Sequence, residues 1–398
     1  MNGVKPIRTL TFSTLFPNRE QPAHGIFVWQ RLRHLLATGR VETRVLAPVA
    51  WFPARSKQFG SYGRLARVPE DEIRDDVNVQ HPRYALVPKI GMTIAPVLLA
   101  YGVKHRVASL LASGFDFDLI DAHYYYPDGV AAMMLGKWFR KPVVITARGT
   151  DINLIPRYRL ARAQILWAAN NSAASITVCE ALRDEMLALG VPPEKVTVLR
   201  NGVDLQLFRP CDRDAVRERL SWRGRILLSV GLLIERKGHH LIVDMLRHLP
   251  ADYSLVIVGE GPMRGSLQRQ IAEAGLGGRV HLLGARNQAE LVELYGAADA
   301  LVLASSREGM ANVLLESIAC GTPLIATRAW GTPEVVRGAA AGVLAPERTP
   351  ESLAEACRTL FAHYPDRAAT RTYAETFSWS ATTQGQLDLF NRVLGTAS

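Results

Sequence analysis

The segment Ser305–Pro323, SSREGMANVLLESIACGTP, holds two glutamates whose types and spacing could serve a ligand. Glu308 stands before Gly309, and Glu316 lies inside an apolar stretch that predicts a helix. Asn312 favours the N-cap position of that helix. The N–H groups at a helix start attract anions, so the segment predicts an anion site with one carboxylate at each side. An ordinary capped helix with surface glutamates explains the same residues, and the pattern alone leaves both readings open.

A second candidate is SVGLLIERKGHHLIVDML, residues 229–246, which reads as strand, glycine turn, two cations and helix. Arg236 and Lys237 would follow the carboxyl end of a strand, where a phosphate could bind to them. Solvated surface charges are the alternative. The turn VGEGPMRG at residues 258–265 nearly matches a dinucleotide fingerprint, but a lone glycine-rich turn is weak evidence. We interpret that turn as structural.

The first half of the chain offers further polar residues after predicted strands. His123 ends the predicted strand FDLIDAH and Asp128 follows it, while Arg148 ends KPVVITAR and Asp151 follows it. Gly25 comes after the first strand, near a helix start. Asp116 and Asp118 form a D-x-D that could hold a metal, but they lie where a strand begins, at the opposite end from the expected site.

These residues need a frame of alternating strands and helices to bring them together. Short apolar runs such as IRTLTFST and VTVLRNG in the first half, and RILLSVG and ALVLASS in the second, alternate with helix patterns such as NQAELVELYGAA. This alternation predicts an α/β protein with two doubly wound parallel sheets. We place a first domain at residues 1–205, a second at 206–376, and a tail helix at 377–398. Ligands of open parallel sheets bind at the carboxyl ends of the strands, so we expect a cleft between two facing domains.

Composition narrows the class of protein. The 398 residues suit two domains, and the apolar and charged fractions, 48% and 21%, are those of a globular chain. A formal charge of +10 favours anionic partners such as nucleotides, nucleic acid or a membrane surface. The four cysteines are dispersed, which indicates reduced thiols in a cytoplasmic protein. The N-terminal residues lack the apolar core of a signal peptide.

One segment indicates a membrane surface. The apolar run IGMTIAPVLLAYGV (Ile90–Val103) is too short to span a bilayer. Between Val77 and Phe115 there is no acidic residue, and Arg83, Lys89, Lys104 and Arg106 flank the run. A basic, apolar segment of this kind is typical of peripheral binding to an anionic membrane, although a buried helix with a basic rim has the same pattern.

The ordered motifs together resemble a known family. EGMANVLLE is similar to the E-x7-E motif of retaining glycosyltransferases of family 4 type, which have two Rossmann-like domains in the GT-B arrangement and include sucrose synthase. RNGVD, VGLLIERKG, VGEGP, ACGTPLIAT and the late FSW follow in that family's order. HGIFVWQR, HYYYPDG and ARGTDIN resemble the branch that builds bacterial exopolysaccharide and teichuronic acid. The resemblance covers nearly the whole chain.

The resemblance implies a hexosyltransferase (EC 2.4) that works with retention and without a metal or other cofactor. The donor would be a nucleotide sugar, UDP more than GDP or ADP, and the acceptor a glycan or polyprenyl-linked sugar. We expect a cytoplasmic protein, peripheral on the inner face of the membrane. The implied catalytic residues are Glu308, at the donor sugar, and His123, which would contact that sugar across the cleft. The implied substrate-binding residues are Glu316 at the ribose, Arg236 and Lys237 at the pyrophosphate, Gly309, Met310, Ala311 and Asn312 at the sugar and phosphate, Gly284 and Arg286 at the base, Gly25 at the phosphates, and Arg148 and Asp151.

Two positions depart from the family pattern. Leu232 stands where many relatives have an arginine after the glycine of VG, and Arg148 stands where many have a histidine. The first departure moves part of the phosphate grip to Arg236. A sugar-nucleotide epimerase on the same plan and a basic nucleic-acid-binding protein remain alternatives, but no recognised nucleic-acid module is present, and we expect no nucleic-acid partner.

Overall fold

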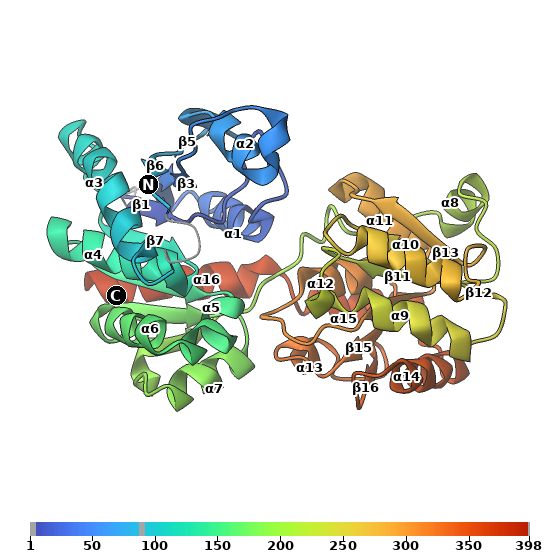
Figure 1. The fold of residues 1–398 in the computed structure, drawn as a ribbon. Helices are drawn as coiled ribbons and strands as arrows, with labels where there is room; N and C mark the ends of the chain where they lie inside the picture. The colour runs from blue at the N-terminus through green and yellow to red at the C-terminus, as the bar shows by residue number, and fades with distance from the viewer. Residues whose placement is uncertain (1–4, 87–91, 397–398) are drawn as a thin grey trace. The chain divides into compact units, whose positions relative to one another are not determined.

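The computed structural model describes residues 5–86 and 92–396, so Lys89 and Ile90 of the apolar segment lie outside the described residues. Contacts divide the chain into two units (Figure 1). Unit 1 runs to Leu199 and resumes at Ala381, and unit 2 is Arg200–Ser380. The divisions thus fall within a few residues of the predicted 205/206 and 376/377.

Unit 1 is built on an eight-stranded sheet of order β10-β9-β8-β7-β1-β2-β5-β4. All neighbours pair in parallel except β4 with β5, which pair antiparallel at one edge. The short strands β3 and β6 pair separately. The strands are β1 (Ile7–Phe12), β2 (Val41–Leu46), β3 (Val49–Ala50), β4 (Asp71–Arg74), β5 (Val77–Gln80), β6 (Arg83–Tyr84), β7 (Leu119–His123), β8 (Val143–Ala147), β9 (Ala174–Thr177) and β10 (Val196–Val198).

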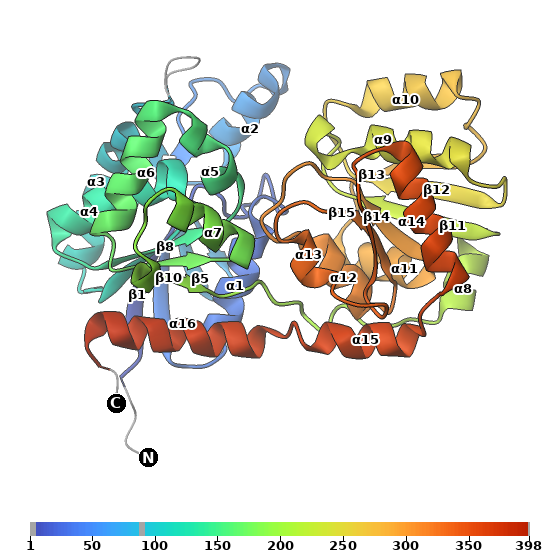
Figure 2. The same ribbon diagram turned by 90° about the horizontal axis from the view of Figure 1, so that it is seen from below.

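Helices cover this sheet. They are α1 (Ile26–Leu36), α2 (Gly60–Arg67), α3 (Ala95–Ala112), α4 (Val130–Phe139), α5 (Thr150–Asn153), α6 (Arg159–Asn171), α7 (Glu180–Ala188) and most of α16 (Trp379–Leu394). The end of α16 lies along unit 1 (Figure 2). It buries Leu387, Leu389 and Phe390 against strand residues such as Leu119 and Val144, so the last helix completes the core made by the first half of the chain.

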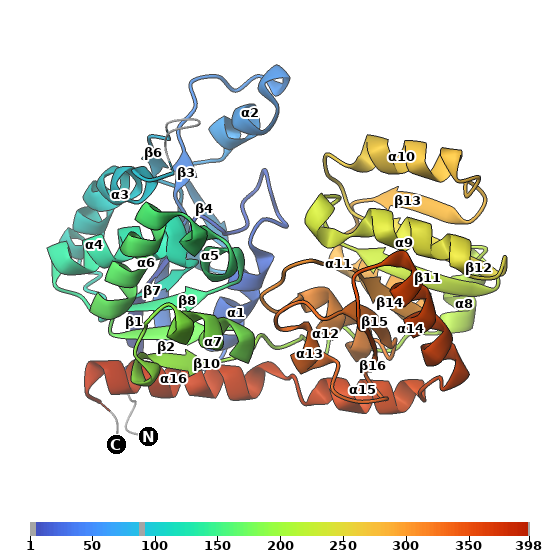
Figure 3. The same ribbon diagram turned by 60° about the horizontal axis from the view of Figure 1, so that its bottom comes forward.

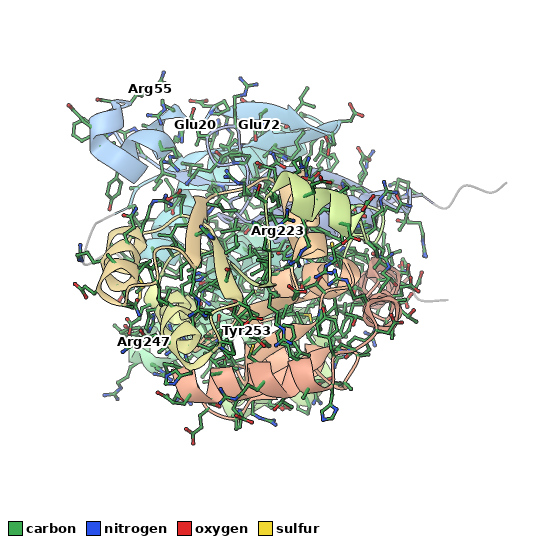
Figure 4. All side chains as sticks on the ribbon, turned by 90° about the vertical axis from the view of Figure 1, so that its right-hand side faces the viewer. Glu20, Arg55, Glu72, Arg223, Arg247 and Tyr253 are labelled. Atoms are coloured by element: carbon green, nitrogen blue, oxygen red, sulfur yellow. The ribbon has the colours of Figure 1, made fainter. Side chains whose placement is uncertain are left out.

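Unit 2 has a six-stranded parallel sheet of order β13-β12-β11-β14-β15-β16. Its strands are β11 (Arg225–Val230), β12 (Tyr253–Val258), β13 (Val280–Gly284), β14 (Ala300–Leu303), β15 (Leu324–Thr327) and β16 (Gly342–Ala345). Its helices are α8 (Arg213–Arg219), α9 (His239–Met245), α10 (Arg264–Glu273), α11 (Gln288–Ala297), α12 (Asn312–Ala319), α13 (Thr332–Val335), α14 (Pro350–Ala362) and α15 (Arg367–Glu375). Tyr253 stands at the start of β12 (Figure 4). Its ring packs edge-on against Phe361 of α14, with 5.4 Å between the ring centroids.

Each sheet reverses its direction of strand addition at one point. In unit 1 the chain builds outward from β1 on one side and from β7 on the other, and in unit 2 from β11 and β14 (Figure 3). The loops after these two neighbouring strands diverge to opposite faces of the sheet, which leaves a ligand-binding position at the carboxyl ends. Several predicted site residues lie at or after the ends of these strands, namely Gly25 and His123 in unit 1 and Arg236, Lys237 and Glu308 in unit 2.

Candidate functional site

The loops after β11 and β14 place the side chains of Arg236 and Lys237 in contact with the carboxylate of Glu308. The ammonium of Lys237 donates to Glu308 Oε1 at 2.7 Å, and Nη1 of Arg236 lies 3.4 Å from Glu308 Oε2. Ser305 Oγ donates to the same Oε1 at 2.7 Å. Arg236 and Lys237 are therefore brought together with Glu308, which lies 71 positions after Lys237, in one charged cluster at the switch point of the sheet.

Glu308 is held in its ionised form. Burial by itself would raise the pKa of this carboxyl, because only 8% of the residue is exposed. The charges of Lys237 and Arg236, together with hydrogen bonds from Lys237 and Ser305, outweigh burial and keep the pKa below its usual value. The carboxylate is thus a fixed negative charge between two cations.

Close backbone packing fixes the position of the cation loop. Gly238, with φ of +73°, approaches Ala304 so closely that a Cβ would lie 2.1 Å from its carbonyl oxygen. The guanidinium of Arg348 joins the same two loops, since it donates to Ala304 O at 2.8 Å and to Glu235 O at 3.1 Å. The turn VGEGP packs against the start of the loop after β11, since a Cβ on Gly259 would lie 1.8 Å from Gly231 O. This gives the turn the structural role that we inferred from the sequence.

The helix after Glu308 begins differently from the prediction. Asn312 is the first residue of α12, the N-cap is Ala311, and no side chain caps the helix. The predicted N-cap role of Asn312 is therefore wrong, because its Oδ1 instead accepts a hydrogen bond from Asn201 Nδ2 at 3.0 Å. Met310 and Ala311 are buried just before the helix, and Gly309 O accepts from Gly331 N at 3.1 Å. The first N–H groups of α12 have no acceptor within the helix and could serve an anion.

Glu316 lies in the second turn of α12, eight positions after Glu308, and its surroundings are different. Its Oε2 accepts a hydrogen bond from the hydroxyl of buried Tyr295 at 2.9 Å. Burial raises the pKa of Glu316 to about 7, against the opposing effect of the Tyr295 hydrogen bond. The two glutamates of the opening motif therefore differ in charge near neutral pH: Glu308 is ionised, and Glu316 is poised to gain or lose a proton.

Gly284 and Arg286, which we predicted at the nucleotide base, and Leu232 lie at the carboxyl ends of β13 and β11 or just after them. Gly284 ends β13, and its carbonyl accepts from Gly259 N at 2.9 Å. Arg286 is exposed and lies 3.7 Å from Glu290 Oε1 in α11. Leu232, at the position where the family often has arginine, is 61% exposed, which leaves Arg236 and Lys237 as the cations of this loop in the described part of the chain.

His239 is a structural part of this site that the sequence analysis missed. Its Nε2 lies 3.3 Å from Leu232 O and its Nδ1 lies 3.0 Å from Ser229 Oγ, so the neutral ring can donate to the loop carbonyl and accept from the hydroxyl. Burial lowers the pKa of His239 to about 4. The sequence KGHH does not indicate this role. The role depends on contacts of His239 with Ser229 and with the carbonyl of Leu232, which only the folded loop brings about.

In unit 1 the structure brings His123 and Arg148 together. Nη2 of Arg148 donates to His123 Nδ1 at 2.8 Å, and His123 Nε2 lies 3.4 Å from Asp121 Oδ2. Burial lowers the pKa of His123, and the charges of Arg148 and Arg31 lower it further against the effect of Asp121. His123 is 1% exposed. Both ring nitrogens therefore face protein groups, and Arg148 is the outer member of the pair, 9% exposed.

Asp151 and Asp128 brace the loops around this pair. The carboxylate of Asp151 is fully buried and accepts the backbone N–H groups of Tyr125 and Gly149, both at 2.7 Å, and of Arg148. Asp128 accepts from Thr14 N at 2.7 Å, and burial raises its pKa to about 7. We predicted a ligand contact for Asp151, whereas the structure shows it holding the loop after β8.

Gly25 allows the first loop to close over the start of α1. It is the residue before Ile26, with φ of +62°, and a Cβ there would lie 2.3 Å from the backbone of Leu15. A side chain at this position would push the β1 loop away from the helix start. The sequence analysis placed Gly25 at the donor phosphates, and in the structure the backbone that it approaches is that of Leu15.

The D-x-D pair is occupied by structural contacts. Lys141 Nζ donates to Asp116 Oδ1 at 2.6 Å, and Arg8 N donates to Asp118 Oδ2 at 2.7 Å. Across residues 5–86 and 92–396 no group of three or more His, Cys, Asp or Glu side chains is arranged to hold a metal ion. The four cysteines, which all lie in the described part of the chain, form no disulfide with one another.

Comparison with known proteins decides the family. Residues 212–377 match the family described as "Glycosyl transferases group 1", and residues 61–207 match "Glycosyltransferase Family 4". The D-inositol 3-phosphate glycosyltransferase of Thermobispora bispora is 32% identical over 70% of this chain and 71% of its own length. The chain is a group 1 glycosyltransferase. The putative teichuronic acid biosynthesis glycosyltransferase TuaC of Bacillus subtilis is 27% identical over 89% of this chain and 88% of its own.

The fold agrees with this membership. The chain is similar to the Anabaena protein HepE solved with UDP and glucose, with a TM-score of 0.73 over 97% of this chain and 100% of the other, at 19% identity. The predicted GT-B fold of two Rossmann-like domains is therefore confirmed. Glycosyltransferase activity is likewise supported, whereas nothing in these comparisons supports the epimerase or the nucleic-acid-binding alternative.

Proposed function

We propose that this glycosyltransferase moves a hexosyl unit from a nucleotide diphosphate sugar, with UDP as the preferred nucleotide, to a glycan or polyprenyl-linked acceptor. The observation that carries the proposal is the cluster of Arg236, Lys237 and Glu308 at the switch point of unit 2. Its cations suit a diphosphate, and its carboxylate suits a sugar. UDP is favoured because HepE, a protein of similar fold, was solved with it.

In the proposed reaction, the cations of this cluster stabilise the departing nucleotide diphosphate. The bond from the anomeric carbon to the diphosphate breaks through an oxocarbenium-like state, and negative charge gathers on the departing phosphate oxygen. Arg236, Lys237 and the first N–H groups of α12 stabilise that charge without requiring a metal. Glu308 holds a sugar hydroxyl and faces the positive charge that develops on the ring. The acceptor attacks from the side of the leaving group, and a phosphate oxygen takes its proton, so the configuration is retained.

Glu316 is proposed to hold the ribose. Its carboxylate can accept hydrogen bonds from two neighbouring hydroxyls, such as those of a ribose. Gly284 and Arg286, at the end of β13, would contact the base. In unit 1, Arg148 is the better placed member of its pair to meet a substrate, because His123 is enclosed.

The acceptor is proposed to belong to bacterial polysaccharide synthesis, as the name of TuaC indicates for that relative. A lipid-linked acceptor would bring the enzyme to the membrane surface. No helix in the described part of the chain is long and apolar enough to cross a bilayer. Unit 1 does expose apolar side chains on α3 and beside α6, namely Ile94, Val97, Tyr101, Tyr158 and Leu160.

This exposed apolar surface has a basic character. Arg157, Arg159 and Arg162 are exposed beside Tyr158 and Leu160, and Lys104 lies 4.8 Å above the ring of Trp138. Residues 77–115 and 152–179, which include α3 and α6, contain no Asp or Glu. Cations beside exposed aromatic and aliphatic side chains suit the headgroups of an anionic leaflet.

The test of the transferase is a product assay. The purified chain is incubated with UDP-, GDP- or ADP-linked hexoses, with and without membrane extract as acceptor source. We expect transfer of sugar only with acceptor, greatest with a UDP-sugar, and retention of the anomeric configuration by NMR of the product. Release of a free or isomerised sugar without acceptor would overturn the proposal, and an inverted product would overturn the retaining mechanism.

A further inference from the structure

We propose that Gln386 and Arg31 are positioning residues, which hold Asp121, His123 and Arg148 in register through a buried chain of hydrogen bonds and one close contact between Asp121 and His123. The inference rests on the proposed function in one respect, that Arg148 and His123 serve the sugar-transfer site. Gln386 lies on α16, more than 260 residues after Asp121, and no motif in the sequence points to it.

The chain of contacts is continuous within unit 1. Nε of Arg31 donates to Gln386 Oε1 at 2.7 Å, and Nε2 of Gln386 donates to Asp121 Oδ2 at 3.1 Å. That same Oδ2 lies 3.4 Å from His123 Nε2, and His123 Nδ1 accepts from Arg148 at 2.8 Å. One amide side chain therefore connects a guanidinium on α1 to a carboxylate on β7.

Burial makes these contacts consequential. Arg31, Gln386, Asp121 and His123 are each 2% exposed or less. A buried charge without a partner is strongly unfavourable, and polar groups in such surroundings depend on every member of the network. The amide of Gln386 is suited to its place because it accepts from Arg31 with one end and donates to Asp121 with the other.

The network also defines the protonation of His123. Arg148 can only donate, so His123 Nδ1 must be the acceptor, and the ring proton lies on Nε2, toward Asp121. Asp121 in turn is oriented by the Gln386 amide. If that amide is lost, Asp121 is free to rotate, and the Nε2–H group of the imidazole loses the carboxylate that lies opposite it.

Arg31 connects the network to the segment where the chain leaves unit 1 and to the helix with which it returns. Besides Gln386 on the returning helix, it donates through Nη1 to the carbonyl of Leu199, the last residue before unit 2. The docking of α16 and the end of β10 therefore fix the same guanidinium that supports Asp121. The orientation of His123 and Arg148 thus depends on the correct seating of the last helix.

The test compares Gln386→Leu and Gln386→Glu with Gln384→Leu, an exposed glutamine on the same helix. For Gln386→Leu we expect kcat to fall about tenfold with donor KM within twofold, since one hydrogen bond to a charged group is removed. Imidazole 15N NMR of labelled protein should show a shift of the His123 Nε2 resonance, because the carboxylate opposite this nitrogen is no longer held in place. Gln384→Leu should leave kcat, KM and the spectrum unchanged.

Gln386→Glu gives a second, shape-conserving readout. The new carboxyl can still accept from Arg31, but it can donate to Asp121 only when protonated. Two carboxyl groups at this distance share one proton, with Arg31, His123 and Arg148 as the other charged or titratable neighbours. We expect the kcat of this variant, divided by that of the wild type, to fall as pH rises from about 5.5 to 8.5.

Opposite results would overturn the proposal. Wild-type kcat and an unchanged His123 spectrum in Gln386→Leu would show that the chain of contacts does not position the site. A flat pH ratio for Gln386→Glu, or a loss of thermal stability with no change in the His123 spectrum, would show a merely structural role. The NMR readout needs no activity, so failure of the transferase proposal itself would be recognised by an inactive wild type with an intact Gln386 effect on the spectrum.

Discussion

The raised pKa of Glu316 makes nucleotide binding depend on pH. Burial lifts this pKa to about 7, and the hydroxyl of Tyr295 at 2.9 Å is its donor in the structure. A ribose presents hydroxyl donors, which an ionised carboxylate accepts better than a protonated one. Binding should therefore favour the ionised form, and the nucleotide should bind more weakly as pH falls through 7.

The size of the effect follows from the pKa. If the bound nucleotide keeps Glu316 ionised, the fraction competent to bind is about one in eleven at pH 6 and about ten in eleven at pH 8, so the Kd of UDP should rise about tenfold between them. Binding at pH 7 should release about half a proton. Isothermal titration calorimetry at pH 6, 7 and 8, in two buffers of different ionisation enthalpy, measures both quantities.

Glu316→Gln provides the control, because UDP has a titrating phosphate of its own. The variant keeps the shape of the side chain and loses its titration, so the ratio of the wild-type Kd to the variant Kd isolates Glu316. We expect that ratio to rise about tenfold from pH 8 to pH 6, with the variant the weaker binder at pH 8. A constant ratio, or a variant that binds as well as the wild type at pH 8, would refute the assignment of Glu316 to the ribose.

Three further predictions use matched variants. Glu308→Gln should lower sugar transfer by about a hundredfold or more, without weakening UDP binding by calorimetry, since it frees Lys237 and Arg236; a fully active variant would refute the sugar-side role. Gly25→Ala should destabilise unit 1 by about 2 kcal/mol or more in calorimetric melting. Gly39→Ala, which also has positive φ but meets no atom within 4 Å, should cost about 1 kcal/mol, and equal effects would contradict the close-approach argument. Tyr101→Ser should reduce sedimentation with anionic vesicles, whereas Ile73→Ser, also exposed, should not; equal binding of both variants would argue against the α3 surface.

The order of elements could be predicted because it depends on local patterns. The apolar runs for β1, β7, β11 and β14 and the helix pattern NQAELVELYGAA appear in the structure as strands and as α11, whose Asn287 makes a capping box with Glu290. Local pattern failed at the start of α12, where a tertiary contact from Asn201 took the side chain of Asn312 away from the cap. It also missed the antiparallel β4–β5 edge and β16, which are short and depend on neighbouring strands.

The sequence by itself determined which residues could do chemistry and that two α/β units carry them. Glu308, Glu316, Arg236 and Lys237 stand after strand-like runs, and ligands of parallel sheets bind at strand ends. Only the tertiary structure decided that β11 lies beside β14, which places Lys237 2.7 Å from Glu308. Strand order is set by packing between segments that are distant in the sequence. The residues of one strand do not show which strand pairs with it. The same reason hid Gln386: its contact with Asp121 exists only because α16 returns to cover the sheet of unit 1.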